Sequence, residues 1–466
     1  MEAMSKDTYD PNSRIDDYLE ALGKDSGLKN DILKVFSDYR TAESKEMPLE
    51  SKLYLLGISV PLIGFAYWVL NEASKNGRKK VYFLSRDGYQ PYLIAKKISE
   101  SLNLETECRY LNVSRLSARI PTYKLDPEKS IDLICVGGID VTPFGILKRG
   151  GLSEEECENI LKETSLTDIR DKILNYREVL EIREELKKCD LLKEYIVKYS
   201  DHAFDDAIGY FKQEGLCDDE KIAIVDSGWI GTLQQSLETL IKCVNPNADV
   251  AGYYFGLYES PKTGNYNSFY FSPSGAIRRK ARFSNSLFEA VVSSSEGMTL
   301  RYKKEDERYY PVFNDAVNPN QTGIESNIEV LFMLLERIGR KSFGEVSTDI
   351  CEKIFNLLMA NPSKLEVETF GDYIFSDDVT DKSLKKVAAE LSVEELKNQR
   401  LINKLLIVLG IKHKTIRESA WIEGSAVKAY GNTNNSNREL GHIRIYKTFV
   451  YCKKQFERMI GVGKNA

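Results

Sequence analysis

Residues 221–234 read KIAIVDSGWIGTLQ. An apolar run over 222–225 ends at Asp226, and a turn with two glycines and two hydroxyl residues follows. Apolar residues from Leu233 onward recur at helical spacing, so the stretch predicts a buried strand, a tight turn and a helix. Ligands bind at the carboxyl ends of strands in open parallel sheets. We therefore predict an α/β fold with a Rossmann-like parallel sheet and a candidate site at Asp226; the alternative is an ordinary connection in which Asp226 caps the helix.

A second stretch repeats this design. Residues 81–89 read VYFLSRDGY, and Pro91 suits the first turn of the helix that follows. Both turns place an aspartate at a strand end, which predicts a shared pocket with Asp87 and Asp226 as its catalytic residues. Backbone and side-chain groups of the two turns are the candidates for binding substrate or phosphate: Ser85, Arg86, Gly88, Ser227, Gly228, Gly231, Thr232 and Gln234.

Further charged residues are candidates for the same pocket. Arg115 follows another strand-like run, and arginine suits a bidentate contact to an oxyanion. Glu289 and Glu296 are candidate general bases, with a structural role as the alternative for each. The sequence indicates no certain cofactor, and Mg²⁺ held by Asp226 is the one metal that we consider.

Composition narrows the class of protein. The chain has 466 residues, a net charge of −5, three histidines and eight cysteines without a CxxC pair. This argues against nucleic acid as a partner, a histidine-rich metal site and a disulfide framework, and it favours a cytoplasmic protein. Residues 53–70 carry no charge, but Gly57, Pro61 and Gly64 interrupt them, so we expect a buried helix pair and no membrane span.

The pattern of apolar and polar residues predicts three parts. Residues 1–48 form an N-terminal helical segment, 49–310 form the Rossmann-like domain with a helical insertion at about 143–215, and 311–466 form a helical C-terminal domain. Further strands are expected over 108–113, 131–136 and 250–258, and a polar loop over 259–284.

Several of these motifs resemble those of a bacterial family. The shared motifs are FLSRDG at 83–88, Ser114-Arg115, VDSGWIGTLQ at 225–234, GYYFGL at 252–257, and Phe288-Glu289 with SSSEG at 293–297. Members of that family tend to be encoded among cell-surface polysaccharide genes and are often joined to a haloacid-dehalogenase-like module. The resemblance implies a setting in carbohydrate biosynthesis.

Resemblance to two kinds of enzyme implies two possible reactions for this chain. Haloacid-dehalogenase hydrolases need two aspartates, two positions apart, at the end of the first strand, and this chain has Ser85 and Asp87 there. Phosphoribosyltransferases bind a sugar diphosphate with an acidic strand end followed by a Gly/Thr loop. Residues 226–232 resemble that loop, one residue shorter and with one of its two acids, and residues 86–88 resemble the pyrophosphate loop.

We therefore expect a transferase that acts on a phosphorylated or nucleotide-linked sugar in cell-surface polysaccharide biosynthesis. The alternatives are a haloacid-dehalogenase-like sugar-phosphate hydrolase and a non-catalytic protein that binds a ligand or scaffolds polysaccharide-biosynthesis enzymes.

Overall fold

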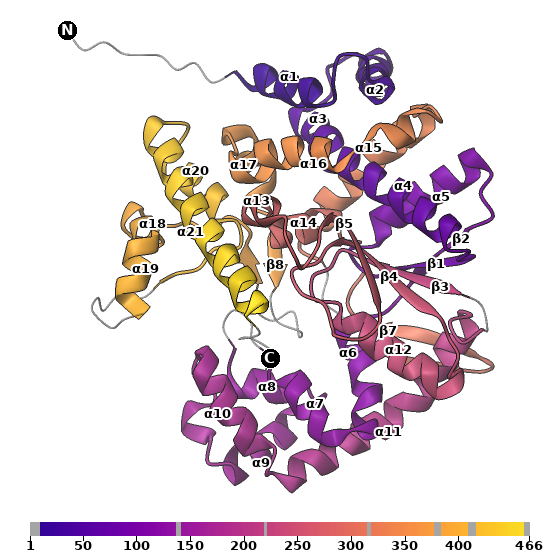
Figure 1. Ribbon diagram of the computed structural model, residues 1–466, viewed down its shortest axis with the longest axis vertical. Coiled ribbons are helices and arrows are strands. Elements are labelled where there is room, and N and C mark those ends of the chain that lie inside the picture. The colour runs from indigo at the N-terminus through magenta and orange to yellow at the C-terminus, as the bar shows by residue number, and fades with distance from the viewer. Residues whose placement is uncertain are drawn as a thin grey trace.

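A five-stranded parallel sheet forms the centre of the protein. The computed structural model describes residues 10–136, 141–218, 221–314, 318–376, 384–408 and 416–460. The strands of the sheet, in spatial order, are β2 (Glu107–Leu111), β1 (Lys80–Leu84), β3 (Ile222–Asp226), β4 (Val250–Gly256) and β5 (Asn265–Phe271). Every neighbouring pair runs parallel, and helices cover both faces (Figure 1). The predicted α/β fold with a Rossmann-like parallel sheet is confirmed.

The order of the strands reverses between β1 and β3. β2 lies on one side of β1, and β3 to β5 are added on the other side. Phe83 of β1 pairs with Val225 of β3, so the carboxyl ends of these two strands lie side by side. Ligands of such sheets bind in the crevice at this reversal of strand order. The topology thus brings the two turns that follow β1 and β3 to one place.

Alternate residues of the strands pack into two cores, as the period of a strand requires. Val81 and Val225 belong to the larger core, which the helices on one face complete. Tyr82 and Ile224 face the other core, which contains side chains of the helices α11 (Asp190–Gln213) and α12 (Thr232–Val244). The antiparallel hairpin of β6 (Thr299–Glu305) and β7 (Arg308–Phe313) packs against this second core.

One continuous helical run passes under the sheet, from α3 (Leu49–Tyr54) through the π-helical turn Leu55–Ser59 to α4 (Val60–Lys75). A single helix therefore replaces the predicted pair, because Gly57, Pro61 and Gly64 are accommodated inside it. It is long and apolar enough to cross a membrane, but 89% of its most apolar window is buried in the protein. Such burial is typical of the core helix of a soluble protein.

A helical insertion separates β2 from β3 and gathers at the opposite end of the molecule from the N-terminal helices (Figure 1). Besides α11 it contains α6 (Arg115–Arg119), α7 (Pro127–Ile134), α8 (Pro143–Lys148), α9 (Glu154–Glu163) and α10 (Tyr176–Leu186), with 3-10 turns at Ile120–Leu125 and Thr167–Ile169. Its side chains form a core of their own. The prediction of a strand over 131–136 is wrong: Asp126 caps a helix that begins at Pro127, and the apolar run is one face of that helix.

Buried residues between 391 and 443 form a small core of their own, apart from the larger core. The remaining helices lie outside the insertion, and most of them contribute to the larger core. They are α1 (Pro11–Ala21), α2 (Gly27–Glu43), α5 (Tyr89–Leu102), α13 (Ile277–Arg282), α14 (Asn285–Val292), α15 (Gln321–Arg337), α16 (Thr348–Phe355), α17 (Lys364–Phe370), α18 (Val393–Asn398), α19 (Leu401–Val408), α20 (Ile422–Tyr430) and α21 (Asn434–Met459), with a 3-10 turn at Ser342–Glu345 and a π-helical turn at Asn356–Ala360. A short hairpin, β8 (Ile374–Ser376) and β9 (Leu384–Lys386), interrupts the C-terminal helices. The prediction of a loop over 259–284 is also wrong in part, since β5 and α13 lie within it.

Candidate functional site

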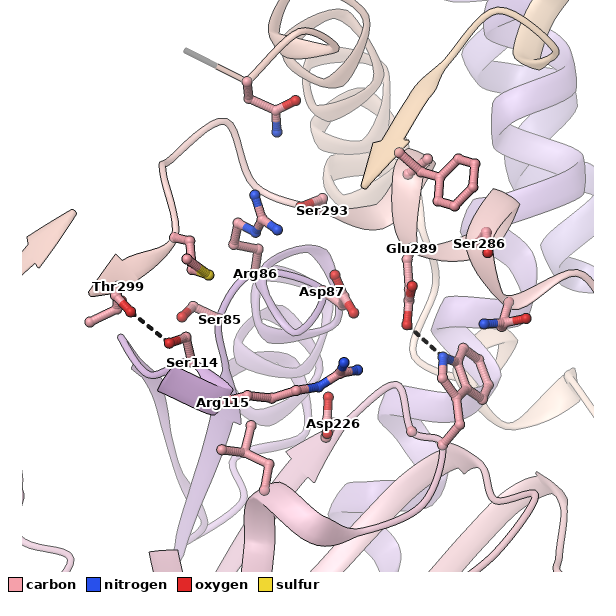
Figure 2. Close-up of a pocket in the computed structure, with 18 of the residues that line it drawn as sticks. Ser85, Arg86, Asp87, Ser114, Arg115, Asp226, Ser286, Glu289, Ser293 and Thr299 are labelled. Atoms are coloured by element: carbon pink, nitrogen blue, oxygen red, sulfur yellow. Dashed lines mark hydrogen bonds between the residues drawn. The ribbon is translucent and has the colours of Figure 1, made fainter. Parts of the chain in front are cut away.

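A cavity of about 290 Å³ opens at the carboxyl ends of β1 and β3. Many of the residues predicted for the site line it: Ser85, Arg86, Asp87, Arg115, Asp226, Gly228, Gly231, Thr232, Glu289 and Glu296. Figure 2 shows several of these side chains pointing toward one another from different elements. The strand order, which the sequence does not specify, is what brings them together.

The turn after β1 is held rigidly against the neighbouring strand. The Ser85 hydroxyl donates to the carbonyl oxygen of Val113 at 2.9 Å and accepts from the Val113 N–H at 3.0 Å. Gly88 packs so closely that a Cβ there would lie 2.4 Å from the carbonyl oxygen of Leu84. Gly88 does not line the cavity and instead lets α5 begin directly at the strand end. Asp87, between these two fixed points, is presented to the cavity.

The turn after β3 presents backbone N–H groups to the cavity. The N–H groups of Ser227 and Gly228 donate to the carboxyl group of Asp226. Gly231 has a φ of +71° and is the N-cap of α12, without a side-chain cap. Among the described residues, no acceptor is found for the N–H groups from 229 to 233. An uncapped helix start of this kind is suited to an anion. The peptide bonds Ser85–Arg86 and Gly228–Trp229, one in each turn, are cis.

Two arginines balance the carboxyl groups. Arg115 is the first residue of α6, which the Ser114 hydroxyl caps, and the carbonyl oxygen of Thr299 fixes that hydroxyl at 2.6 Å. Figure 2 shows the guanidinium group of Arg115 between the carboxyl groups of Asp87 and Asp226. Arg86 approaches Asp87 from the other side of the cavity.

Burial shifts both aspartates toward neutrality. It raises the pKa of Asp87 to about 7; the Asp226 carboxyl adds to this rise, and Arg86 and Arg115 oppose it. Burial likewise raises the pKa of Asp226 to about 7, against the charge of Arg115 and with a further rise from Glu289. Both side chains are half-buried and face the cavity. The walls of the cavity exclude most of the water that would otherwise stabilise their charged forms. Near neutral pH the pair can therefore hold or release a proton.

Glu289 comes from α14 and forms another wall of the cavity. Its Oε1 accepts a hydrogen bond of 2.5 Å from Nε1 of Trp229 (Figure 2). Trp229 is buried among Phe271, Phe283 and Phe288, which hold the indole ring in place. The turn after β3 thus fixes the position of a carboxylate that belongs to a distant part of the chain.

Three predicted site residues lie outside the lining. Ser227 is buried and Gly88 packs on the strand end, as described. Gln234 is fully buried within α12: its Oε1 accepts from the Tyr254 hydroxyl at 2.8 Å, and its Nε2 donates to the carbonyl oxygen of Asn265. Gln234 therefore ties α12 to β4 and β5.

Other lining residues are not among the predicted site residues, although Ser293 belongs to the SSSEG motif at 293–297. Asn285, Ser286 and Ser293 flank Glu289 on α14 and at its end, and residues 318–320 with the β8–β9 hairpin form a further wall. Asn320 fixes that hairpin by exchanging hydrogen bonds with the backbone of Ile374 at 2.6 and 2.8 Å. The Ser284 hydroxyl accepts from the Leu287 N–H and caps the start of α14.

A metal ion bound in the cavity would need some of its ligands from the substrate of the protein. Among the residues that the structure describes, no group of three or more His, Cys, Asp or Glu side chains could hold a metal ion. Mg²⁺ is commonly bound by one or two carboxylates together with phosphate oxygens, so Asp226 fits that arrangement as a single protein ligand.

The function has to be inferred from the geometry of the site, because the comparisons with known proteins identify no family. No model of a known protein family matches the chain, and no curated protein sequence matches it.

Proposed function

We propose that the protein is a transferase that acts on a phosphorylated or nucleotide-linked sugar. The observation that carries this proposal is the meeting of two acidic turns at the reversal of strand order, around one cavity that also holds two arginines and an uncapped helix start. Carboxylates suit sugar hydroxyls, and the N–H groups and arginines suit phosphate.

The phosphate group of the substrate binds the turn from Ser227 to Thr232, where backbone N–H groups open to the cavity. Arg86 and Arg115 offset its charge. Asp226 binds sugar hydroxyls, or Mg²⁺ together with the phosphate. These roles keep the anionic part of the substrate on the side of α12 and direct the sugar toward Asp87 and Glu289.

Transfer then replaces the bond between the sugar carbon and the departing phosphate oxygen by a bond to an acceptor oxygen. The acceptor hydroxyl loses its proton to Asp87, and the phosphate leaves with the bonding electron pair, stabilised by the arginines and the helix start. A carboxyl group with a pKa near 7 is suited to this task because both of its protonation states are available at neutral pH. Glu289 is the alternative base, since Trp229 holds it at the opposite wall.

The setting that we propose is cell-surface polysaccharide biosynthesis on the cytoplasmic side, which rests on the resemblance of the turn motifs. A haloacid-dehalogenase-like hydrolase is the weaker alternative. Its nucleophile position is occupied by Ser85, whose hydroxyl both donates to and accepts from the backbone of Val113 and is not available to attack a phosphate.

A thermal-shift experiment with sugar phosphates, nucleotide sugars and phosphoribosyl diphosphate, each with and without Mg²⁺, tests the proposal. A ligand at 100 times its dissociation constant stabilises the folded protein by about 2.7 kcal/mol. Asp226→Asn should abolish the response, whereas Asp205→Asn, an exposed change on α11, should retain it. Product formation with the responding sugar then separates a transferase from a scaffold, because a scaffold binds without turnover. A folded protein that responds to none of these ligands would contradict the proposal.

A further inference from the structure

A third arginine, Arg119, contacts the uncapped start of α12. Arg119 is 6% exposed, one helical turn beyond Arg115 on α6, and its Nη2 donates to the Thr232 hydroxyl at 2.7 Å. Thr232 is the first residue of α12 and lines the cavity, whereas Arg119 does not reach it. The arginine therefore contacts the site through one hydroxyl group.

The charge of Arg119 has no acidic partner among the described residues. No carboxylate forms an ion pair with it, and its Nε is buried without an acceptor. Burial lowers the pKa of Arg119 to about 10; the Tyr123 hydroxyl opposes this fall, and the charges of Arg115 and Arg149 add to it. A buried cation in such surroundings is unfavourable unless an anion comes close.

The turn that leads into α12 lies next to Arg119, which contacts it through Thr232. Residues 229–233 line the cavity, no acceptor is found for their N–H groups among the described residues, and the positive end of the 13-residue helix α12 begins there. Two independent features, a buried arginine without an acidic partner and an uncapped helix start, therefore favour an anion at one position.

We propose that Arg119 is a positioning residue of a phosphate site at the start of α12, and that this site binds inorganic phosphate even without a sugar attached. Arg119 orients the Thr232 hydroxyl toward the phosphate oxygens and supplies the positive charge behind them. The proposal deepens the proposed function and rests on its assignment of the Ser227 to Thr232 turn to phosphate.

We expect Arg119→Met to weaken phosphate binding without lowering the stability of the ligand-free protein. Arg119→Met keeps the length of the side chain but removes its charge. The ligand-free variant should melt at or above the temperature of the unmodified protein, because the repulsion with Arg115 and Arg149 is gone. Its dissociation constant for phosphate should rise at least about tenfold, the loss expected for one charge-assisted contact. A residue with only a packing role would lower the melting temperature and leave the phosphate response unchanged.

The test is a phosphate titration of the full chain at pH 8, followed by melting temperature, with KCl added to keep the ionic strength constant. Arg119→Lys, which keeps the charge, should retain part of the response, and Arg301→Met, an exposed change on β6, should retain all of it. If Arg119→Met does not fold, Thr232→Val provides the second variant and should also weaken the phosphate response.

Either of two outcomes would overturn the inference. One is a folded protein with no saturable response to phosphate, and the other is a response that Arg119→Met leaves intact. The unmodified protein could respond to phosphate, lose that response on Arg119→Met, and show no response to any sugar phosphate or nucleotide sugar. This result would support the phosphate site and contradict the proposed sugar substrate. A response to a sugar phosphate that is equal in the unmodified protein and in Arg119→Met would support the proposed sugar substrate and contradict the role of Arg119.

Discussion

Trp229 donates the hydrogen bond that fixes Glu289, with 2.5 Å between Nε1 and Oε1. This bond joins the turn after β3 to α14, and it places a carboxylate beside the Asp87 and Asp226 pair. The Trp229 side chain shows little of its surface, and its indole N–H group is the part that contacts Glu289.

Trp229→Phe keeps an aromatic ring but removes that N–H group. We expect a loss of about 1.5–3 kcal/mol in the free energy of unfolding, because the bond has a charged acceptor. Chemical denaturation measures it. Trp68→Phe is the matched control: no hydrogen bond from its indole N–H is found among the described residues, so it should cost less than about 1.5 kcal/mol. A double-mutant cycle with Glu289→Gln should give a coupling energy of at least about 0.5 kcal/mol, and additivity would refute the link.

Asp226→Asn should stabilise the protein at pH 8 and stabilise it clearly less at pH 5. The folded-state pKa of Asp226 is raised to about 7, so the folded protein holds a proton that the unfolded chain has released between about pH 4 and 7. Stability of the unmodified protein therefore falls as pH rises through this window, and the amide removes that loss. We expect about 1–3 kcal/mol at pH 8, since the carboxyl group is partly open to the cavity. Denaturation curves at both pH values, with Asp205→Asn as control, check it; equal effects at the two pH values would contradict it.

Gly88→Ala should destabilise the protein by about 1–3 kcal/mol, because the new methyl group would lie 2.4 Å from the carbonyl oxygen of Leu84 and the strand end cannot move away easily. Gly441→Ala offers a control inside α21, where a Cβ meets nothing within 4 Å. Alanine there should stabilise the helix by about 0.5–1 kcal/mol. Melting temperatures of the two variants should move in opposite directions.

The strands and turns of the site could be predicted from sequence, and their arrangement could not. The apolar runs before Asp226 and Asp87 predict strands that end in polar turns. This prediction does not depend on the order of the strands in the sheet. The position of β1 beside β3 depends on contacts between distant residues such as Phe83 and Val225, which no local pattern contains. The two similar turns predict a shared pocket, and the structure shows that Asp87 and Asp226 line the same cavity.

The errors in the prediction have local physical causes. The run at 131–136 is too short to distinguish a strand from the buried face of a helix, and the Asp126-Pro127 start decides for the helix. β5 reads NYNSFYF, with asparagine and serine among its aromatic residues, because it is an edge strand with a partly exposed face. Trp229 stands out in the sequence as an unusual residue for a simple connection, and Glu289 as a candidate base, but their pairing spans 60 residues and no local pattern contains it.

The helical insertion should open as a unit separate from the sheet, because its core contains only residues from within 115–213. Leu161→Ala, in that core, should speed hydrogen exchange in α7–α10 and leave the strands protected. Leu334→Ala, in the larger core, should expose the sheet as well. Each change should cost about 2–5 kcal/mol in its own unit. Exchange measured by mass spectrometry distinguishes the two patterns, and a uniform increase from Leu161→Ala would rule out separate opening.

The walls of the cavity are spread along about two thirds of the chain, from Ser85 to the β8–β9 hairpin, which ends at Lys386. A ribosome makes these walls one after another, over tens of seconds at about 5–20 residues per second. The strand ends that carry both aspartates emerge well before the segment that closes over them. A chain that stops before the β8–β9 hairpin, whether during synthesis or at an early stop codon, therefore has the acidic residues without this wall of the cavity.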